Sequence, residues 1–222
     1  MSTLKKSKFL VIPVSLRRIS NVLFPANPTK EFNVITHPRA VGLNKSIISP
    51  DEYILAPLRE YKNKFKKGDI VIFAAKINKY TNEYDFTKQY KTFIKETESI
   101  GIKYILISPT PTFSLVEKKE WTNGYTCQEE WYRPSWAISP LCFLRENKSE
   151  WFASHSGAIN KIKKFLLANQ KVSYLDAFSI VCPDPYCKKY DNVSLLYKDN
   201  NHLSSYGAMK IKDTIEAFVR SN

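Results

Sequence analysis

An aspartate and a histidine lie three residues apart near the C-terminus, within the segment LYKDNNHLSSYGA (residues 196–208). This spacing lets the carboxylate of Asp199 accept a hydrogen bond from one imidazole nitrogen of His202 while the other nitrogen faces a nucleophile. Such a pair can supply the acid and the base of nucleophilic catalysis. The alternative is that Asp199 only forms a turn and that His202 is a surface residue beside a helix start.

The segment after this pair has the pattern of an amphipathic helix. Apolar side chains recur there at helical spacing, at Ala208, Ile211, Ile215, Phe218 and Val219. A helix with this stripe packs on a sheet. We therefore expect His202 to lie in a loop at a strand end, held in place by the final helix.

Apolar runs of strand length alternate with longer segments of helical period along the chain, which is typical of a parallel sheet covered by helices. Five strands are expected, at residues 8–14, 31–36, 69–75, 103–108 and 172–176. Five helices are expected: one after Ser15, one from Asp51, one over 86–100, one over about 156–169 and one that begins near Ser204. The predicted fold class is α/β, a three-layer α/β/α sandwich with a five-stranded, mainly parallel sheet.

The stretch from Pro109 to about Ser149 interrupts this alternation. It is rich in proline, tryptophan and cysteine and has weak periodicity. We interpret it as a long insertion above the carboxyl ends of the strands, where open α/β folds place their sites. Because 222 residues without internal repeats suit one core, we expect a single domain over 1–222 that carries this insertion.

The four cysteines form two local pairs, Cys127 with Cys142 and Cys182 with Cys187. Their spacing does not match the knuckles of zinc sites, and no histidine lies nearby to complete a ligand set. Two disulfides are the preferred interpretation, which would place the protein in an oxidising compartment. The alternative is four reduced cysteines in a cytosolic protein.

The net charge is +13, from 34 Lys and Arg against 21 Asp and Glu. A basic chain is attracted to nucleic acid, anionic lipid or acidic polysaccharide. The basic residues here are scattered and do not form an arm with interleaved aromatics, so a solvated surface is the preferred interpretation. The alternative is a basic protein that binds nucleic acid, which would show a steep salt dependence. No apolar run is long enough to span a membrane, and the N-terminal segment is interpreted as a first strand and not as a signal peptide.

The segment LYKDNNHLSSYGA resembles the last conserved block of SGNH/GDSL hydrolases, in the version found in SGNH domains fused to membrane (acyltransferase-3-type) sugar O-acyltransferases. Other segments are similar to further parts of those domains and come in the same order: DIVIFAAKINKY, KYILISPTPTF, CQEEWYRPSWAISPLC and VSYLDAFSIVCPDPYC. The resemblance runs from about residue 69 to the end. It implies an SGNH, flavodoxin-like fold with Asp199 and His202 in a catalytic triad.

The first block departs from the family. That block reads G-D-S-H and holds the serine nucleophile, whereas this chain contains no G-D-S, and Ser15 is the residue that matches the nucleophile. Pro13 stands in the position of the glycine, where it fixes φ and removes an N–H. The alternative is that Ser15 is a helix N-cap. Loose matches to the oxyanion donors are Gly42 and Asn78, and Ala75–Lys76 fits the A-x-R-W form of the third block.

The resemblance implies acyl transfer, in which His202, oriented by Asp199, takes the proton of Ser15 as it attacks an acetyl ester. It implies an acylated sugar or polysaccharide as substrate, including cell-surface polysaccharide or lipopolysaccharide, and a membrane acyltransferase as partner. It also implies a periplasmic or other extracytoplasmic location, and no cofactor or metal is expected. Tyr197 and Trp136 could line a sugar cleft, although core packing also accounts for either. The alternative function is that of a catalytically inactive SGNH fold that binds a glycan or a partner.

Overall fold

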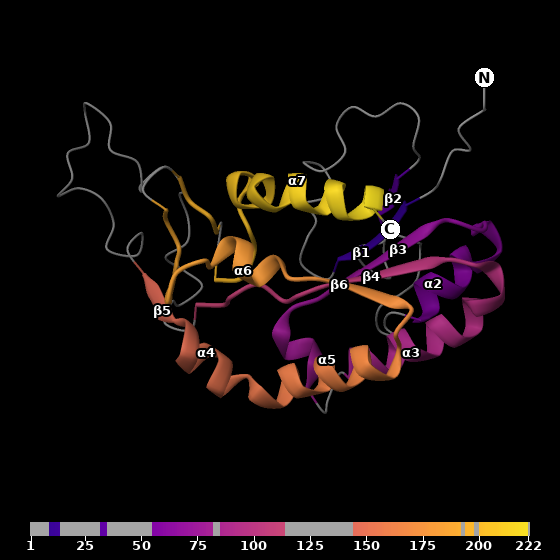
Figure 1. The fold of residues 1–222 in the computed structure, drawn as a ribbon, viewed down its shortest axis with the longest axis horizontal. Coiled ribbons are helices and arrows are strands. Elements are labelled where there is room, and N and C mark those ends of the chain that lie inside the picture. Colours follow the sequence, from indigo (N-terminus) through magenta and orange to yellow (C-terminus); the bar gives the residue numbers. More distant parts are fainter. Residues whose placement is uncertain are drawn as a thin grey trace, which may run out of the picture.

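The structure is a computed structural model that describes residues 9–13, 32–34, 55–81, 85–113, 144–191, 194–197 and 200–221. A five-stranded sheet forms its centre (Figure 1). The strands are β1 (Phe9–Pro13), β2 (Phe32–Val34), β3 (Ile70–Ala74), β4 (Lys103–Ile107) and β6 (Val172–Leu175). Their order is β2-β1-β3-β4-β6, and every pairing is parallel.

The carboxyl ends of four strands meet in one row. Pro13 pairs with Ala74, Ala74 with Ile107, and Ile107 with Leu175. The strand order reverses at β1, because β2 lies on one side of it and β3, β4 and β6 follow on the other. Open α/β sheets bind ligands outside the carboxyl ends of their strands at such a switch point. The end of β1 beside β3 is therefore the place where this fold favours a site.

Strand β3 shows why the sequence forms a buried parallel sheet. All five of its side chains are buried. Val71 and Phe73 belong to the apolar core on one face, whereas Ile70, Ile72 and Ala74 belong to the core on the other. A strand buried on both faces reads as a continuous apolar run, which is what the segment IVIFA provides.

Helices cover both faces of the sheet (Figure 1). On one face lie α2 (Leu55–Tyr61), α3 (Phe86–Thr97) and α5 (Ser156–Ala168), and on the other lies α7 (Ser205–Ser221). In α3 the buried side chains recur on one stripe, at Phe86, Gln89, Tyr90, Phe93, Ile94 and Thr97. No helix in the described ranges is both long and apolar enough to cross a membrane.

The predicted elements are confirmed wherever the structure describes them. All five strands are present close to their expected bounds. Four of the five predicted helices correspond to α2, α3, α5 and α7, and the helix expected after Ser15 lies outside the described residues. Short 3-10 turns, η3 (Lys62–Lys64) and η5 (Glu98–Ile100), extend α2 and α3, and Gly101 ends the latter with a left-handed φ of 78°.

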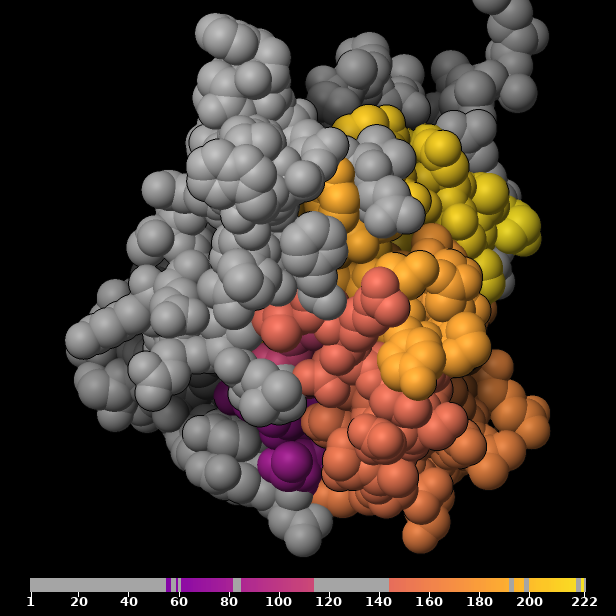
Figure 2. Space-filling view, turned by 90° about the vertical axis from the view of Figure 1, so that its left-hand side faces the viewer, coloured from indigo at the N-terminus to yellow at the C-terminus, as the bar shows by residue number. Residues whose placement is uncertain are grey.

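Several short elements were not predicted. They are the helices α4 (Lys148–Ser154) and α6 (Ala177–Val181), the 3-10 turn η4 (Ile77–Tyr80), and the antiparallel pair of β5 (Arg145–Asn147) with β7 (Tyr186–Lys188). Figure 2 views the side of the molecule on which β5 and α4 lie against the segment that contains β7. Elements this short do not complete enough periods to be read from sequence. The expected insertion therefore ends in regular structure, since β5 lies within 109–149.

A disulfide joins Cys182, at the end of α6, to Cys187 in β7. Both cysteines are buried in the core. Lys148 Nζ donates to the Cys182 carbonyl at 2.9 Å, so the same turn is also tied to α4. The other predicted pair, Cys127 and Cys142, lies outside the described residues.

Candidate active site

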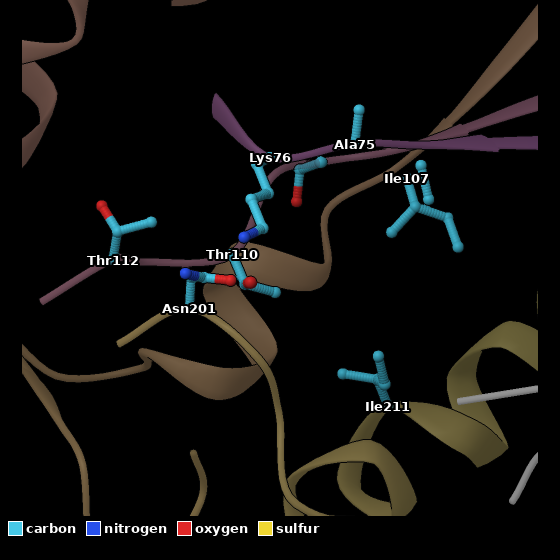
Figure 3. Close-up of a pocket in the computed structure, with 9 residues that line it drawn as sticks. Ala75, Lys76, Ile107, Thr110, Thr112, Asn201 and Ile211 are labelled. Carbon is cyan, nitrogen blue, oxygen red and sulfur yellow. The ribbon is translucent and has the colours of Figure 1, made fainter. Parts of the chain in front are cut away.

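A pocket opens at the carboxyl edge of the sheet, where β3 and β4 end (Figure 3). The strand ends contribute Ala74, Ala75, Lys76, Ile107 and Ser108 to its lining. The loop after β4 and the C-terminal segment contribute Thr110, Thr112, Asn201 and Ile211. The lining is small and apolar on one side, whereas hydroxyl, amide and ammonium groups gather on the other. Such a pocket combines an apolar wall with a few convergent polar groups, as ligand sites do.

His202 lies in a short loop whose base is closed by backbone pairing. Tyr197 and Leu203 form an antiparallel bridge on either side of residues 198–202. The Ser204 amide donates to the Leu196 carbonyl at 2.9 Å and extends this stem. Both bridge residues are buried, whereas His202 is partly exposed. The stem therefore holds the short loop in which Asn201 lines the pocket and His202 directly follows it.

The loop after β4 is attached to the histidine loop. The amide of Phe113 donates to the carbonyl of Asn200 at 2.9 Å. The ring of Phe113 packs edge to face on Tyr197, with ring centroids 4.9 Å apart. Tyr197 is only 1% exposed, so it is a core residue and not a wall of an open cleft. Burial raises the pKa of its hydroxyl well above the usual range, and the Thr110 side chain opposes that shift.

Helix α7 anchors the segment that leads into the histidine loop. Asp191 accepts hydrogen bonds from the Tyr206 hydroxyl at 2.9 Å and from Lys210 Nζ at 2.5 Å. The hydrogen bond to Asp191 is the main reason why the pKa of Lys210 is raised. Ser194 closes the turn, because its amide donates to Asp191 Oδ1 at 3.1 Å. Two turns of α7 thus hold the start of the loop.

Helix α4 positions one wall of the pocket from outside. Its residue Trp151 is 4% exposed and packs on Phe178, with ring centroids 4.7 Å apart. The indole Nε1 donates to Thr112 Oγ1 at 3.3 Å. Thr112 lines the pocket, so α4 helps to fix the loop after β4.

Ser108 is a second serine at the site, and its hydroxyl has a structural role. Its Oγ accepts from the Phe178 amide at 2.7 Å and lies 3.4 Å from Asp176 Oδ1. Its amide donates to the Leu175 carbonyl at 2.9 Å. Asp176 in turn caps α6 by accepting from the Ser179 amide and hydroxyl. Ser108 therefore joins the end of β4 to the start of α6, and its hydroxyl is engaged with these groups.

Of the five predicted catalytic and oxyanion residues, the structure describes His202 and Asn78. His202 directly follows the lining residue Asn201, but it is not itself among the described lining residues. Asn78 is exposed in η4 and is not among them either. Asp199, Ser15 and Gly42 lie outside the described residues. The catalytic roles of all five residues, His202 and Asn78 included, remain predictions.

Sequence reasoning missed most of the pocket lining. Of this lining, the sequence singles out as site residues only Ala75 and Lys76, which match the third block. Thr110 and Thr112 follow the end of β4, and Asn201 precedes the histidine. The available signal was their position just after buried apolar runs, because parallel strands bring such residues to one edge. The described residues contain no group of three or more metal-binding side chains that could hold a metal ion.

Two solved structures with TM-scores above 0.5 share this fold. The catalytic C-terminal domain of peptidoglycan O-acetyltransferase A from Streptococcus pneumoniae is 14% identical, with a TM-score of 0.53 over 97% of this chain and 93% of that one. The YxiM protein of Bacillus subtilis is 12% identical, with a TM-score of 0.51 over 97% of this chain and 56% of that one. An acetylxylan esterase from Geobacillus stearothermophilus is 11% identical, with a TM-score of 0.49 over 97% and 94%.

No curated protein sequence is significantly similar to this chain. Residues 38–217 match the family described as the SGNH domain fused to AT3 domains, which is most of the chain and includes the pocket and the histidine loop. The chain therefore belongs to the SGNH domain family of the kind fused to AT3 domains.

Proposed function

We propose that this chain transfers or hydrolyses O-acetyl groups on a cell-surface glycan, with Ser15 as nucleophile, His202 as base and Asp199 as the acid that orients it. The observation that carries the proposal is the pairing of Pro13 with Ala74 at the carboxyl edge. Ser15 follows Pro13 by two residues, and one residue extends a chain by at most ~3.6 Å. Ala74 lines the same pocket as Asn201, the neighbour of His202.

The reaction proceeds in two balanced halves. The Ser15 hydroxyl gives its proton to His202 as Oγ bonds to the acetyl carbon, and the carbonyl π electrons move onto oxygen. The intermediate then collapses, the ester C–O bond breaks, and His202 returns the proton to the departing alcohol. In the second half a sugar hydroxyl or water attacks the acetyl-enzyme in the same way and releases Ser15.

The family and its structural relatives support a sugar substrate. The pneumococcal relative is named as a peptidoglycan O-acetyltransferase, and members of the matched family are fused to AT3 domains. A membrane acyltransferase is therefore the proposed acyl donor partner, and a sugar hydroxyl is the proposed acceptor. The buried Cys182–Cys187 disulfide supports an extracytoplasmic, oxidising location, periplasmic in a cell with two membranes.

Hydrolysis of p-nitrophenyl acetate tests the proposal. The purified chain is expected to turn over the ester, and Ser15→Ala and His202→Gln are each expected to lower kcat/KM on the order of 10³-fold or more. Ser156→Ala is the matched serine control and is expected to retain activity, because Ser156 is exposed at the start of α5 and is not among the described lining residues. Wild-type protein without esterase activity, or activity unchanged in Ser15→Ala, would favour the inactive glycan-binding alternative or another nucleophile.

A further inference from the structure

The pocket contains one charged side chain among its nine described lining residues, and that side chain is Lys76. We propose that the Lys76 ammonium stabilises the negative charge on the acyl oxygen of the tetrahedral intermediate. This inference rests on the proposed acetyl-transfer function and names a catalytic residue for it. In this proposal the oxyanion donor that follows β3 is the charged Lys76 side chain and not the amide of Asn78.

The backbone holds Lys76 at the correct edge of the sheet. Lys76 is the second residue after Ala74, which pairs with Pro13 at the end of β1 and with Ile107 at the end of β4. Ser15 bears the same relation to Pro13 that Lys76 bears to Ala74. Neighbouring strands lie ~4.8 Å apart, so β1 and β3 end side by side at Pro13 and Ala74.

The two neighbours of Lys76 restrict its backbone. Ala75 is 6% exposed and Ile77 is 3% exposed, and both pack in the core on the α3 and α5 side. Lys76 has extended backbone angles, φ −64° and ψ 151°, immediately before η4. With both neighbours buried against that core, the Lys76 side chain extends into the pocket on the opposite side (Figure 3).

The surroundings of the ammonium suit an oxyanion. Figure 3 shows the Lys76 side chain extending toward Thr110 and Asn201, the wall formed by the loop after β4 and by the histidine loop. Ala74 and Ile107 add apolar surface to the same pocket, and charge interactions are stronger where water is excluded. A positive group at this wall faces the space between the histidine loop and the end of β3.

A charge placed here acts on the transition state. The ground-state ester is neutral, and a full negative charge develops on its carbonyl oxygen only when the carbon becomes tetrahedral. Lys76 keeps its proton throughout and pairs with that oxygen, and the pairing ends when the electrons return to re-form the carbonyl. Loss of the ammonium should therefore lower kcat, while KM changes little.

Steady-state hydrolysis of p-nitrophenyl acetate by Lys76→Met, Lys76→Arg and Lys79→Met tests this inference. Lys79 is the matched control, because it lies in η4 with its Nζ 5.9 Å from the centre of the Phe86 ring and is not among the described lining residues. We expect Lys76→Met to lower kcat about 100-fold with little change in KM. We expect Lys76→Arg to retain much of kcat, and Lys79→Met to match the wild type.

Three results would overturn the inference: unchanged kcat in Lys76→Met, a rise in KM alone, or equal losses in Lys76→Met and Lys79→Met. Thermal melting of each variant excludes misfolding, and Lys76→Arg provides a second readout if Lys76→Met is unstable. Acetate binding, followed by NMR titration, separates this inference from the proposed function. If the wild type is no esterase, the acetyl-transfer proposal fails, and Lys76 as an oxyanion-binding group survives only if acetate binding is lost in Lys76→Met and kept in Lys79→Met.

Discussion

Gly207 lies against the carbonyl of Leu196 so closely that a Cβ on residue 207 would stand 2.1 Å from that oxygen. No real side chain tolerates such a distance to backbone. The first turn of α7 therefore rests directly on the stem of the histidine loop, where the Ser204 amide donates to the same Leu196 carbonyl. The glycine of the segment LSSYGA is required by this contact.

Replacement of Gly207 by alanine is expected to push α7 away from the stem. We predict a loss in the free energy of unfolding of about 2 kcal/mol or more, because the clash is with backbone that cannot rotate away. Esterase activity should fall as well, since the same movement displaces His202. Urea unfolding monitored by circular dichroism, together with p-nitrophenyl acetate turnover, measures both effects.

Gly157 offers a matched control for this substitution. A Cβ at Gly157, in the first turn of α5, would meet nothing within 4 Å. Gly157→Ala should therefore leave activity unchanged and raise stability by roughly 0.5–1 kcal/mol, because alanine loses less conformational freedom in a helix. Equal stability changes in the two variants would contradict a close approach at Gly207.

Ser108→Ala is expected to destabilise the fold while it spares catalysis. The substitution leaves the buried Phe178 amide without the acceptor that now lies 2.7 Å away, which costs about 1–3 kcal/mol. Because the proposed nucleophile is Ser15, kcat should stay near the wild-type value under conditions where the variant is folded. A thousandfold loss of kcat in folded Ser108→Ala would instead assign the chemistry to this serine.

The Cys182–Cys187 disulfide is expected to stabilise the edge of the site. The two cysteines are separated by 5 residues in sequence, so the disulfide closes a short loop. For a loop of this length the chain-entropy model gives a stabilisation of about 2 kcal/mol. The double variant Cys182→Ala/Cys187→Ala should therefore unfold at lower urea concentration, and the reductant dithiothreitol should no longer affect this part of the fold. Stability equal to that of the wild type in the double variant would mean that the bond does not form in the protein.

The ion pair between α2 and α3 predicts a pH-dependent stability. Arg59 donates to both carboxylate oxygens of Glu96, with a shortest distance of 2.7 Å, and this lowers the pKa of Glu96 below its usual 4.5. A lowered folded-state pKa stabilises the fold above the unfolded-state pKa, and this contribution is lost as pH falls through the folded-state pKa. Glu96→Gln should therefore lower the free energy of unfolding by about 0.5 kcal/mol at pH 7. Below the folded-state pKa of Glu96 the substitution should have almost no effect on stability. A pH-independent difference between the two unfolding curves would refute the assignment.

Strands β3 and β4 could be predicted from the sequence because they are buried on both faces of the sheet. The segments IVIFA and KYILI read as strands without any tertiary information. Helices α4 and α6 could not be recognised in the same way, since α4 is fixed by tertiary contacts such as the Trp151 indole bond to Thr112. Their sequences span only 7 and 5 residues, which is too short for the hydrophobic period to repeat several times.

In the candidate site, too, only features formed by residues adjacent in sequence could be predicted. The place of His202 in a loop before the final helix could be predicted, because that loop and helix are adjacent in sequence. Lys76 and Thr110 come together only when β3 and β4 pair, so their joint position could not be read from either segment alone. Ser15 remains a prediction, supported by the place of β1 beside β3.

The most direct test of the central claim is to map a covalent adduct after treatment with a small sulfonyl fluoride, by peptide mass spectrometry. An active-site serine activated by His202 is sulfonylated far faster than other serines. We predict modification of the peptide that contains Ser15 in the wild type, and its loss in both Ser15→Ala and His202→Gln. An adduct on Ser108 or on another residue, or a rate of modification that does not depend on His202, would contradict the account.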